Sequence, residues 1–417
     1  MLNKQIITFC FLILFIFSCQ SPGNQHKKTA NDKPATISLP DPGVITKEEE
    51  KQIKDACQRW YDTSLAPKNF NGEMIVAKKG NIIFEVYNGT TRLPGNEKIT
   101  AQTPLHIASV SKTFTSAAIL KLYEQNKLNL DDTLTKYFPG FNYPGITIRS
   151  LLAHRSGLPN YLYFMEKLGW DKTITISNQD VLDFLINRKG EIKDIRKPNT
   201  NFNYCNTNYC LLALVIEKVS GTSYPDFLQT YFFNPLQMKN TFVFTTKDSL
   251  TAIPSYDHKG NIYPFNFLDG VYGDKNIYTT ARDLLIWDRA LTSNQLLNKE
   301  TVEQAYIPYS NEKEGIRNYG LGWRMNVYPD GKKLVYHNGW WHGSNAVFMR
   351  LLQDSATIIV IGNKFNRSIY GARALCNLFG NYYGLEEEEE AEKKAEANNT
   401  NSRKDQLLNK PPAAKTK

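Results

Sequence analysis

The sequence has few cysteines and few histidines, 6 of each among 417 residues. The cysteines form no Cys-x-x-Cys pair, and no pair of histidines lies close to them. Because a structural zinc site needs several such ligands at short spacings, we expect neither a metal nor any other cofactor. An exported protein can form disulfides, but the spacing of these cysteines selects no pairing.

The chain also lacks a basic stripe and a long apolar run. The formal net charge is +9, but the 50 lysines and arginines are scattered as single residues and Lys-Lys pairs. This distribution argues against nucleic acid as a partner. The apolar run at residues 6–17 is shorter than the roughly 20 residues that a membrane-spanning helix needs.

That short run is typical of an export signal, with Lys4 as its charged start. The sequence Ile-Phe-Ser-Cys that ends at Cys19 resembles a bacterial lipoprotein signal, in which the cysteine receives the lipid. We therefore predict a signal peptide at 1–18 and a lipid on Cys19 that holds the protein to a membrane surface of a bacterial cell envelope, periplasmic or outward-facing. An ordinary signal peptide and an uncleaved anchor are the alternatives.

Composition divides the rest of the chain into three parts. Residues 19–45 are polar and rich in proline, which predicts a flexible tether. Residues 46–385 have the apolar content of a folded domain. Residues 386–417 contain almost no large apolar side chains, which predicts a disordered charged tail or a frayed extension of the last helix.

Two regions rich in β-forming residues flank a helical region. One is a hairpin pattern at 73–89, and the other begins after about residue 318. Between them, about 127–300, the pattern favours helices and long loops. We therefore predict an α+β fold. An antiparallel sheet of five or more strands, built from both ends of the chain, would be flanked by helices and interrupted by a mostly helical insertion.

The stretch IASVSKTFTSAA places Ser109 and Lys112 three residues apart at the start of a helical pattern. Side chains at this spacing lie on one face of a helix. A serine hydroxyl needs a base within hydrogen-bond reach, and a lysine amine can serve where burial disfavours its charged form. The same spacing also occurs by chance, with the lysine on a solvated face.

Two further stretches carry polar side chains suited to acyl transfer. Tyr204 and Asn206 lie two apart just before a helix, where a phenol and an amide would face the same side. In VYHNGWWHGSN, His337-Asn338-Gly339 ends a strand, and the N–H of Trp340 would complete an oxyanion hole with that of Ser109. Each stretch taken alone is also compatible with an ordinary turn.

In this order, the three stretches resemble the active site of the serine β-lactamase and penicillin-binding protein superfamily, which uses S-x-x-K, Y-x-N and then K-T-G or H-x-G. The chain is similar in particular to class C β-lactamases and to related D-alanyl-D-alanine peptidases and esterases. The resemblance covers about residues 50–383 and includes the phrases KLNLDDTLTKYFP, LLAHRSGLPNY, FFNPLQMKNT and YTTARDLLIW.

The resemblance implies a β-lactamase/transpeptidase-like fold and a serine hydrolase that works through an acyl-enzyme. Ser109 would be the acylated nucleophile, and Lys112 and Tyr204 would share the general-base role in a division left open. Asn206 would hold the substrate amide. The segment His337-Asn338-Gly339 would line the edge strand that receives the acyl chain.

The substrate class implied is a D-amino-acid peptide, a cell-wall fragment or a small ester. His337 stands where β-lactamases usually carry a lysine that faces the substrate carboxylate, which favours a peptidase or esterase over a true β-lactamase. Trp340 and Trp341 are bulky enough to narrow the pocket or to stack on an acyl group. His154, in a family phrase, is expected to brace a loop. A binding or sensor protein that is acylated without turnover is the main alternative.

Overall fold

The structure, a computed structural model, describes residues 35–384. The predicted signal peptide, the lipidation site Cys19 and the charged tail from residue 386 lie outside these residues. Within the described part, no helix is both long enough and apolar enough to cross a membrane.

The end of the segment assigned to the tether is hydrogen-bonded to the domain. The N–H of Ile37 donates to the carbonyl of Pro235, and the N–H of Gly43 donates to the carbonyl of Lys79, both at 2.8 Å. The part of this segment from residue 37 onward is therefore attached to the fold rather than extended away from it.

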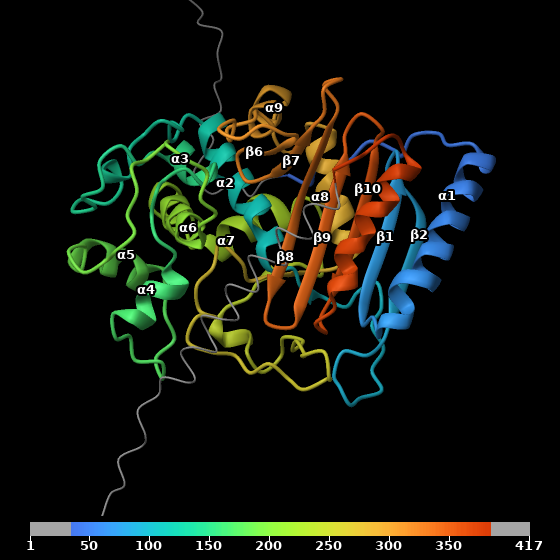
Figure 1. The fold of residues 1–417 in the computed structure, drawn as a ribbon, viewed down its shortest axis with the longest axis horizontal. Coiled ribbons are helices and arrows are strands. Elements are labelled where there is room, and N and C mark those ends of the chain that lie inside the picture. Colours follow the sequence, from blue (N-terminus) through green and yellow to red (C-terminus); the bar gives the residue numbers. More distant parts are fainter. Residues whose placement is uncertain (1–34, 385–417) are drawn as a thin grey trace, which may run out of the picture. The chain divides into compact units, whose positions relative to one another are not determined.

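A seven-stranded antiparallel sheet forms the centre of the domain (Figure 1). Its order is β2 (Asn81–Asn88), β1 (Gly72–Lys78), β10 (Ala356–Gly362), β9 (Ser344–Leu351), β8 (Lys333–Trp341), β7 (Arg324–Val327) and β6 (Arg317–Tyr319). The first strand in the chain, β1, pairs with the last, β10. Both ends of the chain therefore build this sheet, which confirms the α+β prediction and the antiparallel sheet of five or more strands.

Helices cover both faces of the sheet. Successive side chains of a strand point to opposite faces, and in β10 Ile358 and Val360 face one apolar cluster while Ile359 and Ile361 face the other. The helix α1 (Lys47–Trp60) and a 3₁₀ helix (Arg367–Leu378) pack on the first face, and α8 (Ala281–Thr292) packs on the second. The last helix of the described residues, Arg367–Leu378, is thus a 3₁₀ helix rather than an α-helix.

The remaining helices lie between β2 and β6 in the chain. They are α2 (Lys112–Glu124), α3 (Ile148–Leu152), α4 (Tyr161–Lys167), α5 (Asn178–Asn187), α6 (Asn206–Ser220), α7 (Tyr224–Leu228) and α9 (Lys299–Ala305). A second, three-stranded sheet combines β3 (Leu105–His106), β5 (Ile277–Thr279) and β4 (Phe242–Val243). The region at 127–300 is therefore mainly helical but also supplies two short strands.

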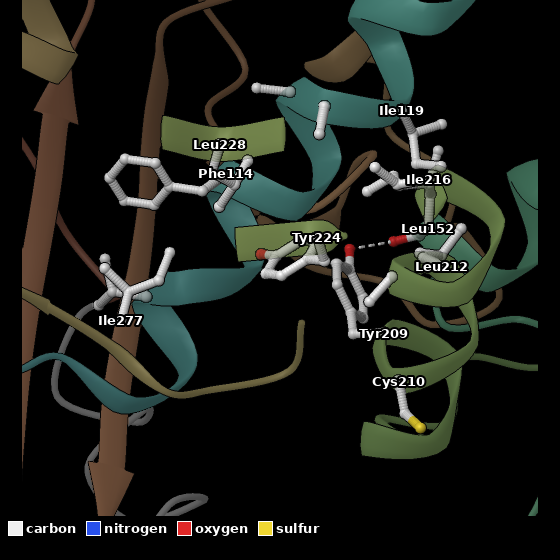
Figure 2. Packing of buried hydrophobic residues seen from close by; sticks show 14 of the residues in the cluster. Phe114, Ile119, Leu152, Tyr209, Cys210, Leu212, Ile216, Tyr224, Leu228 and Ile277 are labelled. Carbon is white, nitrogen blue, oxygen red and sulfur yellow. Dashed lines mark hydrogen bonds between the residues drawn. The ribbon is translucent and has the colours of Figure 1, made fainter. Parts of the chain in front are cut away.

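Two buried helices carry the candidate site residues at their N-terminal ends. Both α2 and α6 are buried on nearly every side, as expected for helices surrounded by protein. Phe114 on α2 stacks on Trp287 with ring centroids 4.2 Å apart. On α6, Tyr209 donates a hydrogen bond of 2.8 Å to the carbonyl of Leu152 (Figure 2). These contacts join α2 to α8 and α6 to α3, and α2 also packs directly against α6.

Candidate active site

Ser109 lies on a 3₁₀ turn (Ala108–Ser111) that leads directly into α2. A 3₁₀ turn has about three residues per turn, so residues i and i+3 lie one above the other. This geometry aligns Ser109 with Lys112 more closely than the regular helix that the sequence suggested. Ala108 has a φ of 47°, in the left-handed region that non-glycine residues rarely adopt. Local strain therefore lies directly beside the serine.

Lys112 is fully buried, and its amine has three hydrogen-bond acceptors. The Nζ atom donates to Ser109 Oγ at 3.1 Å, to Asn206 Oδ1 at 2.8 Å and to the backbone carbonyl of Asp274 at 2.7 Å. All three contacts of this nitrogen are hydrogen bonds to oxygen atoms. The nitrogen also lies 5.0 Å from the ring centroid of Tyr204. The first two sequence motifs therefore meet at this amine.

Tyr204 sits in the loop before α6 and is packed between two basic side chains. The centroid of its ring lies 4.3 Å from the ring centroid of His154. The same centroid lies 5.2 Å from the guanidinium carbon of Arg324. Asn206 is the first residue of α6 and turns its side-chain oxygen to Lys112. The motif therefore places the ring of Tyr204 and the side-chain oxygen of Asn206 close to the amine of Lys112.

His154 is a fully buried histidine that fixes this loop. Its Nδ1 accepts a hydrogen bond of 3.1 Å from the backbone N–H of Cys205, the residue between Tyr204 and Asn206. Burial lowers its pKa well below the usual value, and the nearby charge of Lys112 acts in the same direction. The neutral imidazole thus holds the loop through the backbone N–H of Cys205. This contact is consistent with the bracing role expected for His154.

The third motif lies on β8, beyond the end of β7. Strand β7 pairs with β8 only at residues 333–336, whereas residues 337–341 pair with β9. The motif is therefore not on the outermost strand on this side of the sheet, which is β6. It does lie on a stretch of β8 that extends past the end of β7 and has no pairing with that strand. That stretch passes directly beside the turn that carries Ser109.

His337 is fully buried and held at both ring nitrogens. Nδ1 lies 2.7 Å from the carbonyl of Asn338, and Nε2 lies 3.2 Å from the hydroxyl of Tyr319. Burial lowers its pKa well below the usual range, and the positive charges of Arg324 and Lys112 lower it further. His337 is therefore a neutral, structural neighbour of Tyr204 rather than a charged contact for a substrate.

Gly339 is needed for the packing of β8 against the nucleophile turn. A Cβ at this position would lie 2.2 Å from the carbonyl oxygen of Ile107 and 3.3 Å from the Cβ of Ala108. In the structure the close approach is made by the protein's own chain.

The two tryptophans after the glycine are each held by a hydrogen bond. Trp340 Nε1 donates to the carbonyl of His342 at 3.1 Å. Trp341 Nε1 donates to Asp269 Oδ1 at 2.6 Å. Both indoles are half-buried, so their positions are set by the protein.

Sequence reasoning missed two contributors to this site. The carbonyl of Asp274 anchors Lys112, but a backbone acceptor has no side-chain signature in the sequence. Arg324 reaches Tyr204 because β7 pairs with β8, with Arg324 opposite Tyr336. The sequence shows a cation directly after the Gly-Trp pair at 322–323, but only the strand pairing shows that it adjoins the site.

Neither metal ligation nor a disulfide contributes to this arrangement. Among residues 35–384, no group of three or more His, Cys, Asp or Glu side chains could hold a metal ion. The four cysteines of the same region, Cys57, Cys205, Cys210 and Cys376, are buried and unpaired.

The chain matches a known family over most of its length. A sequence model of the family described as Beta-lactamase matches residues 70–374, which is most of the chain. The chain belongs to this family. The family is one of serine hydrolases with the β-lactamase fold, and the relatives of the chain include a penicillin-binding protein.

Two curated proteins are similar to this chain in sequence. Penicillin-binding protein 4* of Bacillus subtilis is 32% identical over 365 residues, covering 82% of this chain and 80% of that protein. Protein flp of Staphylococcus aureus (strain MW2) is 28% identical over 352 residues. That match covers 81% of this chain but 65% of protein flp, which is the longer protein.

Solved structures share the fold. The octameric penicillin-binding protein homologue from Pyrococcus abyssi has a TM-score of 0.68 at 23% identity, covering 78% of both chains. D-amino acid amidase from Ochrobactrum anthropi SV3 has a TM-score of 0.61 at 20% identity, covering 80% of this chain and 96% of that one. At these identities the likeness establishes the architecture alone.

Proposed function

We propose that this protein is a serine hydrolase that forms an acyl-enzyme on Ser109, of the carboxypeptidase or esterase type. The observation that carries the proposal is the single amine of Lys112, which is hydrogen-bonded to both Ser109 Oγ and Asn206 Oδ1. A buried amine in contact with a serine hydroxyl is the arrangement that activates a nucleophile.

The proposed reaction has two steps. As Ser109 Oγ bonds to the substrate carbonyl carbon, its proton passes to the base formed by Lys112 and Tyr204. The N–H groups of Ser109 and Trp340 stabilise the oxyanion, and Tyr204 returns a proton to the leaving amine or alcohol when its bond to carbon breaks. Water then attacks the ester and releases the acid by the same steps in reverse.

The proposed substrates are D-amino-acid peptides, cell-wall fragments or small esters. Support for the first two comes from the positive charge of Arg324 beside Tyr204, which suits a substrate with a free carboxylate. His337 stands where β-lactamases usually carry a lysine and is buried and neutral, so it cannot make the contact of that lysine with a β-lactam carboxylate.

A substrate panel tests the proposed function. D-Ala-D-Ala peptides, short p-nitrophenyl esters and nitrocefin would be offered to the wild-type protein and to Ser109→Ala. We expect steady turnover of a peptide or an ester, slow or absent nitrocefin hydrolysis, and no turnover by the variant. Acylation that stops after one equivalent would instead favour a sensor, and rapid nitrocefin hydrolysis would favour a true β-lactamase.

We also propose that the protein is a lipoprotein of a bacterial cell envelope, attached through Cys19. The proposal is supported by the short apolar run at residues 6–17 and by the Ile-Phe-Ser-Cys sequence that ends at Cys19. Fractionation of cells that express the wild-type protein and Cys19→Ser tests it. The wild-type protein should be found with membranes, and the variant should not; membrane association of both would contradict the lipid anchor.

A further inference from the structure

A second buried lysine lies beside the one in the active site. Lys275 is 3% exposed, and its Nζ donates a hydrogen bond of 2.5 Å to the hydroxyl of Tyr161. Tyr161 donates in turn to Asp274 Oδ2 at 3.0 Å, and the same carboxylate oxygen lies 3.6 Å from Lys275 Nζ. We refer to Asp274, Lys275 and Tyr161 as the Lys275 triad.

The triad is connected directly to the active-site lysine. Of the three hydrogen bonds of Lys112 Nζ, the one to the backbone carbonyl of Asp274 is the shortest, at 2.7 Å. The loop that carries this carbonyl is held in place on both sides. Thr115 on α2 donates to the carbonyl of Gly273 at 2.6 Å, and a Cβ on Gly273 would lie 2.4 Å from the carbonyl oxygen of Tyr209.

The triad also reaches the end of β8. Lys275 Nζ lies 4.8 Å from the ring centroid of Trp341, and the indole of Trp341 is fixed by its hydrogen bond to Asp269. Trp341 follows Trp340, whose N–H is the proposed oxyanion donor. The buried side chain of Lys275 therefore lies between the anchor of Lys112 and the strand that completes the site.

Two charged side chains of the triad lie close to Lys112: Lys275 interacts with its charge, and Asp274 contacts its amine through the backbone carbonyl. The other titratable or charged side chains around this amine are Tyr204, Tyr209, Cys205, His154 and His337, with Arg324 on the ring of Tyr204. Burial lowers the pKa values of the two histidines well below the usual range, so these side chains are neutral. Burial also lowers the pKa of Lys275, which the charge of Asp274 opposes.

We propose that Asp274, Lys275 and Tyr161 are positioning residues that set the charge and the direction of the Lys112 amine, and thereby the pH at which Ser109 becomes reactive. This inference rests on the proposed function of Ser109. None of the three triad side chains is required to touch the substrate; they act through Lys112.

Two charge-changing variants test the inference through opposite shifts. Lys275→Met removes a neighbouring positive charge, so a charge on Lys112 persists to higher pH. Asp274→Asn removes a negative charge and has the reverse effect. The rate of Ser109 labelling by a fluorophosphonate would be measured from pH 5 to 10. The half-maximal pH should rise for Lys275→Met and fall for Asp274→Asn, each by on the order of one pH unit.

A matched control separates charge from stability. Asp288 is another buried carboxylate, hydrogen-bonded to Arg350 at 2.5 Å, and it lies on α8 outside the site. Asp288→Asn makes the same chemical change and should lower the melting temperature without moving the half-maximal pH. Tyr161→Phe removes the bridging hydroxyl without changing a charge, and should slow labelling by about tenfold through loss of the hydrogen bonds.

The outcomes are distinguishable. Opposite shifts in the two charge variants support the inference. Unchanged profiles in folded Lys275→Met and Asp274→Asn proteins, or shifts of the same sign in both, would overturn it while leaving the proposed function intact. If one of the two does not fold, a wild-type labelling rate in Tyr161→Phe would overturn it as well. Failure of the wild-type protein to be labelled at Ser109 would overturn the proposed function instead.

Discussion

The residues around Ser109 combine buried cations with neutral histidines. Lys112 and Lys275 are buried, and Arg324 is partly exposed beside Tyr204. His154 and His337 have pKa values that burial lowers well below the usual range. Among the basic side chains at the site, Arg324 therefore has both a permanent charge and some access to solvent. A substrate carboxylate would find its charge partner there.

The first prediction concerns Arg324. Arg324→Met should raise the KM for peptides that end in D-Ala-D-Ala by about 10- to 100-fold, the value of a hydrogen bond to a charged group. Turnover of p-nitrophenyl acetate, which has no carboxylate, should change less than about threefold. Initial-rate kinetics on both substrates measure this difference.

Arg282→Met is the matched control for this variant, because Arg282 pairs with Glu85 away from the site. It should leave both KM values unchanged. An equal loss on the peptide and the ester in Arg324→Met would show that Arg324 supports Tyr204 rather than the substrate.

At the scale of elements, the site depends on the contact between β8 and the turn that carries Ser109. Gly339 lets the strand pass the carbonyl of Ile107, and the N–H of Ile107 donates to the carbonyl of Ile277 on β5 at 3.0 Å. Three separate segments of the chain thus meet at the residues just before the nucleophile.

Gly339→Ala tests this contact. The added Cβ would lie 2.2 Å from a backbone oxygen, so the strand or the turn must shift. We expect the rate of Ser109 labelling to fall at least about tenfold, since small displacements of reacting groups are costly. Gly190→Ala is the control, because a Cβ there meets nothing within 4 Å. A normal labelling rate in a folded Gly339→Ala protein would contradict the packing argument.

The sequence predicted these elements unequally well, for physical reasons. The pairing of Ser109 with Lys112 follows from local helical geometry, and the hairpin and the helix that closes on Gly221 follow from turn chemistry. The role of the Asp274 carbonyl and the position of Arg324 depend on contacts between distant segments. The buried state of His337 is of the same kind, because it depends on Tyr319 and on the covering of β8.

At the scale of the whole molecule, burial of neutral histidines ties stability to pH. Burial lowers the pKa of His106 to about 3, with the charges of His342 and Lys275 acting in the same direction and Asp269 opposing them. An unfolded histidine has a pKa of about 6.5. Below that pH the unfolded chain binds a proton that the folded protein does not. The contribution of His106 to stability is therefore complete above pH 6.5 and is lost as the pH falls toward 3.

His106→Gln tests this linkage. Between pH 6 and pH 4, the free energy of unfolding of the wild-type protein should fall more steeply with acid than that of the variant. The difference between the two slopes should be up to about 1.4 kcal/mol per pH unit. Urea denaturation at several pH values measures both slopes. The exposed His258→Gln serves as control. Equal slopes in wild type and His106→Gln would contradict the account.

The central claim is that Ser109 is the residue that is acylated. The most direct test is to incubate the protein with a fluorophosphonate or a fluorescent penicillin and to locate the adduct by mass spectrometry of its peptides. We predict one adduct on the peptide that contains Ser109, and none in Ser109→Ala. Equal labelling of the variant, or an adduct on another serine, would contradict the claim.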